Sequence, residues 1–293
     1  MRMRYQTMQE IRVTDRSGKY LTLYDIDGRL FPRMVKEENI RAIGEIQLRD
    51  DDIFLCGMPR SGHHWAYEMV NMLLSGKAEQ SPHDLDRGVL ELTSNSELDA
   101  IPSPRVMTTH VCYRFLPPVQ QKKIPIIHLV RDPRDVLVSH FKLCKAWPGD
   151  NYDGTFSDWL DLYSKGKLAW GSWFDHCKDW ERVSSENPDL RYLRLHYEDM
   201  KSNTLEVVKT IARFLGLNVS SELCVSISNK CQFEQMKKDH ANRTHIWSDQ
   251  MVHFQKGEPG EWKNWFNKEE TEAFSKLYKT EMANTCLESR YCQ

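Results

Sequence analysis

A glycine loop that begins at Gly57 carries the residue types that bind phosphate. Gly57 and Gly62 have the G-x-x-x-x-G spacing of a Walker A loop, and they follow the apolar run 53–56. A buried strand, a glycine loop and a helix starting there point backbone N–H groups and the positive end of the helix dipole at one place. The next residues are His63 and His64, where a Mg²⁺-dependent nucleotidase requires Lys and then Ser or Thr. The loop is therefore predicted to bind a phosphate-type anion by a different chemistry.

Three other residues capable of chemistry, His110, Arg131 and Tyr197, each come directly after a predicted strand. Strands are predicted over residues 53–56, 105–109, 124–130 and 190–196. Helical patterns cover residues 65–74, 133–145, 155–165, 170–185, 203–215, 221–229 and 268–285. Alternating strands and helices predict an α/β fold with a parallel sheet and helices on both faces. Because such folds bind ligands at the carboxyl ends of the strands, all three residues and the glycine loop are predicted to meet at one edge.

Composition limits the classes of partner. The chain has 293 residues, a formal net charge of −2 and a pI of about 6.6. This balance lacks the domain-wide positive field that binds nucleic acid or an anionic membrane, so neither is an expected partner. The N-terminal residues lack an apolar leader, and no run approaches about 18 apolar residues, which predicts a soluble, cytoplasmic protein. The eight cysteines show no C-x-x-C pair or zinc spacing, so reduced thiols and no metal site are expected.

The chain is predicted to form a single domain over residues 1–293. Residues 1–50 mix charges with short apolar runs and are expected to be an N-terminal extension with one hairpin. Residues 75–104 are polar and rich in loop signals around a short helix near 84–92, which is typical of a mobile or substrate-facing loop. Residues 250–266 place lysines beside flexible glycines and are expected to fold over a bound anion.

Four motifs occur in a fixed order within residues 51–280. They are the loop PRSGHHW, Arg131 followed eight residues later by Ser139, Tyr197 in the run HYEDM, and the run QKGEPGEWK that begins at Gln255. Together they resemble the cytosolic sulfotransferases, which transfer sulfonate from 3′-phosphoadenosine 5′-phosphosulfate (PAPS) to an alcohol, phenol or amine. In that family the loop has the pattern Pro-Lys-Ser-Gly-Thr-Thr-Trp. The resemblance implies PAPS as co-substrate, with no metal required.

PAPS carries a 3′-phosphate and a 5′-phosphosulfate, so it needs two anion sites. The helix after the glycine loop supplies one, and Arg131 with the Ser139 hydroxyl supplies the other. His110 matches the catalytic histidine of the family, and a strand-end imidazole is a suitable general base near neutral pH. Arg60 is expected to stabilise charge on the bridging oxygen. The resemblance implies cofactor contacts from Arg60, Ser61, Gly62, His63, His64, Trp65 (stacked on adenine), Arg131, Ser139, Tyr197, Cys231, Phe233, Gln255, Lys256 and Gly257.

Several of these positions depart from the family pattern. Arg60 replaces a lysine, so the charge survives as a rigid fork. His63 and His64 replace two threonines, and their imidazole N–H groups would make binding more sensitive to pH. Cys231 stands where the family has a polar Thr, and Gln255 stands where it has an arginine. Both changes weaken the expected polar contact with the nucleotide.

The expected partner is a small, partly apolar acceptor. Its pocket is expected from the variable loops 81–104, 147–155 and 242–254, whose shape one sequence does not give. The family's dimer signature, Lys-x-x-x-Thr-Val-x-x-x-Glu, keeps Lys263 and Glu272 but has lost its Thr-Val centre. The chain is therefore expected to be a monomer, or a dimer that does not use this motif.

Three functions remain open from the residues. The first is transfer of sulfonate from PAPS to a hydroxyl or amine, with His110 as base. The second is a catalytically silent protein that binds PAPS or its desulfated product PAP, an alternative motivated by the substituted contact positions. The third is an ATP-dependent small-molecule kinase, which the glycine spacing favours and which His63 and His64 oppose.

Overall fold

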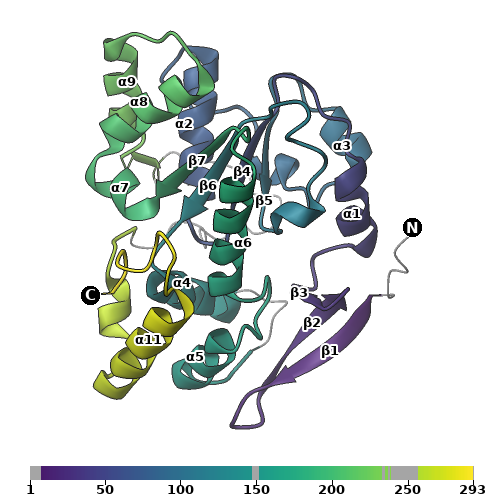
Figure 1. Cartoon of the computed structure of the whole chain (residues 1–293), viewed down its shortest axis with the longest axis vertical. Coiled ribbons are helices and arrows are strands. Elements are labelled where there is room, and N and C mark those ends of the chain that lie inside the picture. Colours follow the sequence, from purple (N-terminus) through teal and green to yellow (C-terminus); the bar gives the residue numbers. More distant parts are fainter. Residues whose placement is uncertain (1–7, 147–151, 233–234, 237, 239–256, 293) are drawn as a thin grey trace.

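A computed structural model of the chain describes residues 8–146, 152–232, 235–236, 238 and 257–292 (Figure 1). Its larger sheet has four parallel strands in the order β5-β4-β6-β7. These strands are β4 (Ile53–Gly57), β5 (Val106–Thr109), β6 (Ile126–Val130) and β7 (Tyr192–His196). Every residue of β4, β5 and β6 is buried, because helices cover both faces. The predicted α/β class, with a parallel sheet flanked by helices, is confirmed.

The alternation of side chains along β4 divides the protein into two cores. Phe54 and Cys56 point into one cluster, whereas Ile53 and Leu55 point into the other. The second cluster is closed by α2 (His63–Ser75), α8 (Thr204–Leu215) and α9 (Ser221–Lys230). The first is closed by α4 (Pro133–Ala146), α5 (Phe156–Ser164), α6 (Trp173–Glu186) and α11 (Lys268–Glu281).

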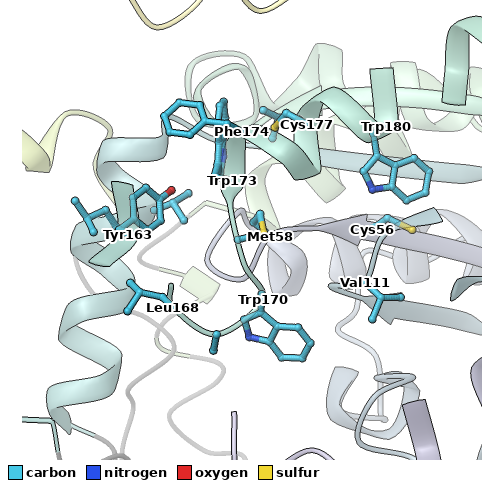
Figure 2. Packing of buried hydrophobic residues seen from close by; sticks show 14 of the residues in the cluster. Cys56, Met58, Val111, Tyr163, Leu168, Trp170, Trp173, Phe174, Cys177 and Trp180 are labelled. Atoms are coloured by element: carbon cyan, nitrogen blue, oxygen red, sulfur yellow. The ribbon is translucent and has the colours of Figure 1, made fainter. Parts of the chain in front are cut away.

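Large aromatic residues fill the first core. Figure 2 shows Trp173, Phe174 and Trp180 of α6 together with Cys56 of β4 and Met58 of the glycine loop. Trp173 and Trp180 are no more than 1% exposed, so the helix is anchored along its length. The buried aromatic side chains hold α6 against one face of the sheet, next to the strand ends that carry the predicted site residues.

Short elements complete the chain. They are the helices α1 (Glu37–Ala42), α3 (Asn95–Asp99) and α7 (Tyr197–Ser202) and the 3-10 turns η1 (Ile43–Glu45), η2 (Leu85–Gly88), η3 (Tyr113–Phe115) and η4 (Glu261–Asn264). Among the longer helices, two predicted boundaries differ from the structure by three residues or more. α6 begins at Trp173 rather than at Trp170, because the Ser172 side chain caps it by accepting from the backbone N–H of Asp175. α11 ends at Glu281, four residues before the predicted end. None of the helices within the described residues is long and apolar enough to cross a membrane.

The first 50 residues form more than the one predicted hairpin. β1 (Gln9–Thr14), β2 (Tyr20–Ile26) and β3 (Arg29–Phe31) make a three-stranded antiparallel sheet, in which two consecutive hairpins share β2. Phe31 is fully buried in the same core as the tryptophans of α6. The backbone N–H of Trp170 also donates to the Leu30 carbonyl at 2.8 Å. The small sheet is therefore packed against the loop that leads into α6.

Candidate active site

The strand ends meet as the sequence predicts. His110 follows β5, and its Nδ1 lies 2.8 Å from the carbonyl oxygen of Gly57 at the end of β4. Arg131 follows β6, and its Nη1 donates to the Arg60 carbonyl at 3.0 Å. Its guanidinium carbon lies 4.1 Å from the centroid of the Tyr197 ring, which follows β7. The glycine loop and the three predicted residues thus form one connected group at the carboxyl edge of the sheet.

The glycine loop takes a shape that depends on its residue types. At Gly57 a Cβ atom would lie 2.4 Å from the Leu129 carbonyl oxygen on β6, so any side chain would collide with the backbone. Gly62 has φ 102° and caps α2, whose first intrahelical bond runs from the Ala66 N–H to the Gly62 carbonyl. The N–H groups before Ala66 therefore point out of the helix start. Arg60 has φ 71°, a strained conformation for a residue with a Cβ, of the kind often found at binding sites.

Ser139 bonds with Arg60 rather than with Arg131. The Nε of Arg60 donates to the Ser139 hydroxyl on α4 at 2.8 Å. Arg131 precedes α4, and its guanidinium lies over the Tyr197 ring. Burial, and then the nearby charge of Arg131, lower the pKa of Arg60 to about 10. Two guanidinium groups held this close together form a strongly electropositive centre that suits an anion.

Buried polar atoms around the loop lack partners among the described residues. They include the Ser61 hydroxyl, His63 Nε2, Trp65 Nε1 and Arg131 Nε. Unpaired buried groups are rare in native proteins and each calls for an explanation, such as a bound ligand or water. A polyanionic nucleotide would supply acceptors for these donors. The donor set therefore fits the phosphate groups of PAPS.

His110 is arranged as a base. A carbonyl only accepts hydrogen bonds, so the Nδ1 of His110 must donate to Gly57, and the neutral ring carries its lone pair on Nε2. The ring is edge-to-face with His63 at 4.6 Å and with Trp170 at 5.0 Å between centroids. Burial lowers the pKa of His110, although the charge of Glu91 and the Gly57 carbonyl act in the opposite direction. A neutral imidazole at neutral pH can accept a proton.

The remaining predicted contacts lie at different depths. Trp65 is 6% exposed, and its ring meets the edge of Tyr197 at 5.6 Å between centroids. His64 is half-buried. Gly257 accepts a hydrogen bond from the Tyr197 hydroxyl at 3.2 Å. Cys231 is fully buried in the second core, and burial raises its thiol pKa to about 12. Phe233, Gln255 and Lys256 lie outside the described residues, as does the first part of the predicted covering loop, residues 250–256, whereas residues 257–266 are described.

Two residues at this edge were not predicted. Glu91 contacts the backbone of His110 from the segment before α3, and Trp170 lies against the His110 ring. Neither belongs to a recognisable motif, and Trp170 falls within a helical pattern. No group of three or more His, Cys, Asp or Glu side chains in the described part of the chain could hold a metal ion.

The fold and site define an α/β protein that presents an anion-binding loop, two arginines and a neutral imidazole at one sheet edge. A family model for the sulfotransferase domain matches residues 50–286. Sulfotransferase 1B1 of Canis lupus familiaris is 34% identical over 270 residues, which cover 86% of this chain and 90% of the relative. Sulfotransferase 6B1 of Danio rerio is 30% identical and covers 100% of this chain and 99% of the relative.

Solved structures agree with the family match. Mouse sulfotransferase SULT7A1 complexed with PAP has a TM-score of 0.79 and 31% identity, covering 92% of this chain and 98% of that chain. Retinol dehydratase in a complex with retinol and PAP also has a TM-score of 0.79, but at 20% identity it supports the fold alone. The chain belongs to the sulfotransferase family, and it is a PAPS-dependent sulfotransferase.

Proposed function

We propose that the enzyme transfers the sulfonate of PAPS to a hydroxyl or amine of a small, partly apolar acceptor, with His110 as the general base. The observation that carries this proposal is the bond between His110 Nδ1 and the Gly57 carbonyl. It leaves Nε2 as the proton acceptor of a ring joined to the anion-binding loop. A base fixed beside the leaving-group site can act in the same step as the transfer.

The nucleotide is bound by two connected groups. The start of α2 and Arg60 hold the 5′-phosphosulfate, and Arg131 with Tyr197 holds the 3′-phosphate and the adenosine beside it. The unpaired donors around the loop support this assignment, as does the PAP found in the mouse relative. Ser139 acts on the same site through Arg60, whose Nε it orients. The oligomeric state, expected to be a monomer or a dimer that does not use the family motif, and the cytoplasmic location stay predictions.

The reaction moves one proton and one sulfonate. The acceptor oxygen or nitrogen attacks sulfur while His110 Nε2 takes its proton. The bond between sulfur and the bridging oxygen of the 5′-phosphate breaks, and the bonding electrons leave with PAP. Arg60 and the N–H groups at the start of α2 stabilise the charge that builds on that oxygen.

The acceptor class follows from the surroundings of the base. The Trp170 ring borders His110, so an acceptor that reaches this base meets an aromatic, apolar side chain beside its reacting group. Phenols, steroids and long-chain alcohols are therefore the acceptors we expect.

Transfer from ³⁵S-labelled PAPS to phenols, steroids, alcohols and amines tests the proposal. His110→Ala is expected to abolish transfer while PAP still binds in calorimetry, and Val225→Ala, at an exposed position of α9, is the control. Retained turnover in His110→Ala would remove His110 as the base. If the wild type binds PAP but transfers to no acceptor, the silent-binder alternative replaces catalysis.

A further inference from the structure

Glu91 is a fully buried carboxylate directly behind the strand end that carries His110. Its Oε1 accepts from the His110 N–H at 2.5 Å, the Val111 N–H at 3.0 Å and the Thr109 hydroxyl at 2.8 Å. Glu91 itself has no exposed surface. One carboxylate oxygen therefore holds three consecutive residues at the end of β5.

The backbone fixes Glu91 in this place. The Leu90 N–H donates to the Thr108 carbonyl at 3.0 Å, and Val89 forms a parallel bridge with Thr108. The segment before Glu91 thus pairs with β5 through an isolated parallel bridge. Because backbone pairing sets its register, the carboxylate does not depend on side-chain packing alone to reach the end of β5.

Hydrogen bonding alone does not explain a charged residue here. A buried carboxylate is expensive unless it is paired. Yet Glu91 forms no ion pair within the described residues, and its Oε2 has no hydrogen-bond partner there. A glutamine carbonyl could accept the same three bonds without burying a charge. The three hydrogen bonds therefore do not by themselves require a carboxylate at this position.

The group that gains from this charge is His110. Three other imidazoles face it: His63 from α2, His140 from α4 and His176 from α6. Burial lowers the pKa of all three, so these imidazoles are neutral near pH 7 and do not balance a positive charge on His110. Burial also lowers the pKa of His110, and Glu91 opposes that effect. Among these groups Glu91 is the acid that can stabilise an imidazolium.

We propose that Glu91 is a positioning residue and the counter-charge of His110, holding its backbone in place and stabilising the imidazolium formed during transfer. This rests on the proposed role of His110 as base. Glu91 touches neither acceptor nor nucleotide. It acts through the end of β5, while the Gly57 carbonyl keeps the Nδ1 proton and directs the incoming proton to Nε2.

Glu91→Gln tests the charge while keeping the shape. NMR titration of the His110 ring should give a lower pKa than in the wild type, because a nearby anion that favours the charged form has been removed. The acidic limb of the kcat/KM profile should move to lower pH, with kcat on the plateau reduced by about 10-fold or more because the base is weaker. KM for PAPS should stay within about 3-fold, since Glu91 does not contact the nucleotide in this assignment.

Thr109→Val is the matched control, because it removes one hydrogen bond to the same oxygen and leaves the charge. Thr109→Val should leave the His110 pKa unchanged. Glu91→Asp keeps the negative charge, so its His110 pKa should lie close to that of the wild type. An unchanged His110 pKa in a folded Glu91→Gln would overturn the proposal. If Glu91→Gln does not fold, Glu91→Asp provides the test. A His110 pKa in Glu91→Asp that lies about one unit below the wild-type value, although the negative charge is kept, also overturns the proposal. The NMR readout is independent of turnover, so failure of His110 as the base is detected separately through His110→Ala.

Discussion

The Nε of Arg60 donates to the hydroxyl of Ser139 at 2.8 Å, and this bond joins the glycine loop to α4. The carbonyl of the same arginine accepts from Arg131 Nη1 at 3.0 Å. Arg60 is thus held at its backbone and at its side chain, which helps to maintain its φ of 71°. The residues of the two anion sites expected from the sequence are therefore joined by hydrogen bonds through Arg60.

The first prediction concerns this coupling. Ser139→Ala removes the acceptor that orients Arg60, and we expect PAP to bind about 2- to 10-fold more weakly, the usual worth of one such hydrogen bond. Arg60→Lys keeps the positive charge but replaces the planar guanidinium, and with it the Nε that bonds to Ser139. Calorimetric PAP affinities of both variants and the double variant should show a coupling of about 1 kcal/mol. Strict additivity would show that the bond does not contribute to binding.

The second prediction concerns Arg131. Arg131→Ala should weaken PAP binding by about 10- to 100-fold, because a charged donor to phosphate is lost. The PAP affinity of Arg131→Lys should lie between those of the wild type and Arg131→Ala, since an ammonium does not reproduce the planar contact with the Tyr197 ring. Tyr197→Phe is the control that keeps this ring. Unchanged affinity in Arg131→Ala would remove it from the 3′-phosphate site.

The third prediction concerns the start of the loop. Gly57→Ala would place a Cβ 2.4 Å from the Leu129 carbonyl oxygen, so β4 and β6 must separate. We expect a loss of roughly 2–4 kcal/mol in the free energy of unfolding, measured by urea denaturation. Gly44→Ala is the control, because a Cβ there meets nothing within 4 Å. Equal effects of the two substitutions would contradict the steric argument.

The fourth prediction concerns pH. Burial, with smaller contributions from Arg60 and His110, lowers the pKa of His140 to about 4, and burial holds those of His128 and His176 well below the usual value. At these histidines the unfolded chain therefore binds more protons than the folded chain between pH 6.5 and 4. Their contribution to stability should be fully present above pH 6.5 and be lost as the pH drops toward 4, by up to about 3 kcal/mol for His140 alone. Asp86, whose pKa burial raises to about 7, acts in the opposite direction, so the histidine contribution is measured as a difference between variants.

Urea denaturation at several pH values between 7.5 and 4.5 measures this slope. His140→Phe keeps a ring that can pack edge-on against Trp159, as the imidazole does with 5.3 Å between centroids. It should flatten the pH dependence. His83→Gln, at an exposed position, should leave it unchanged. The same slope in His140→Phe and the wild type would show that this imidazole is not the cause.

Sequence alone predicted the part of the site that local pattern determines. Apolar runs ending at polar residues marked the strand ends, so His110, Arg131 and Tyr197 were correctly brought to one edge. The partner of Ser139 was not predicted, because helical spacing from Arg131 says nothing about a residue that precedes the helix. The direction of the Arg131 side chain depends on Tyr197, which is distant in the sequence.

Glu91 and Trp170 depend entirely on long-range contacts. The three bonds of Glu91 reach residues 18 to 20 positions away, and nothing in its own segment marks it. Trp170 fitted a helical period, but the cap at Ser172 excludes it from α6, and its φ of 74° places it in a turn. A capping residue defines the first residue of a helix more sharply than apolar spacing does.

The contact between the N-terminal sheet and Trp170 separates two properties of the enzyme. Leu30 and Arg29 bind the backbone of Trp170, by 2.8 Å and 3.3 Å hydrogen bonds, far from Arg60 and Arg131 in the chain. A change in the β2–β3 hairpin can therefore shift the indole against His110 without altering a residue of the anion-binding network. If Trp170 borders the acceptor as proposed, acceptor selectivity and nucleotide affinity can diverge independently during evolution, and a hairpin exchanged between relatives would carry the first without the second.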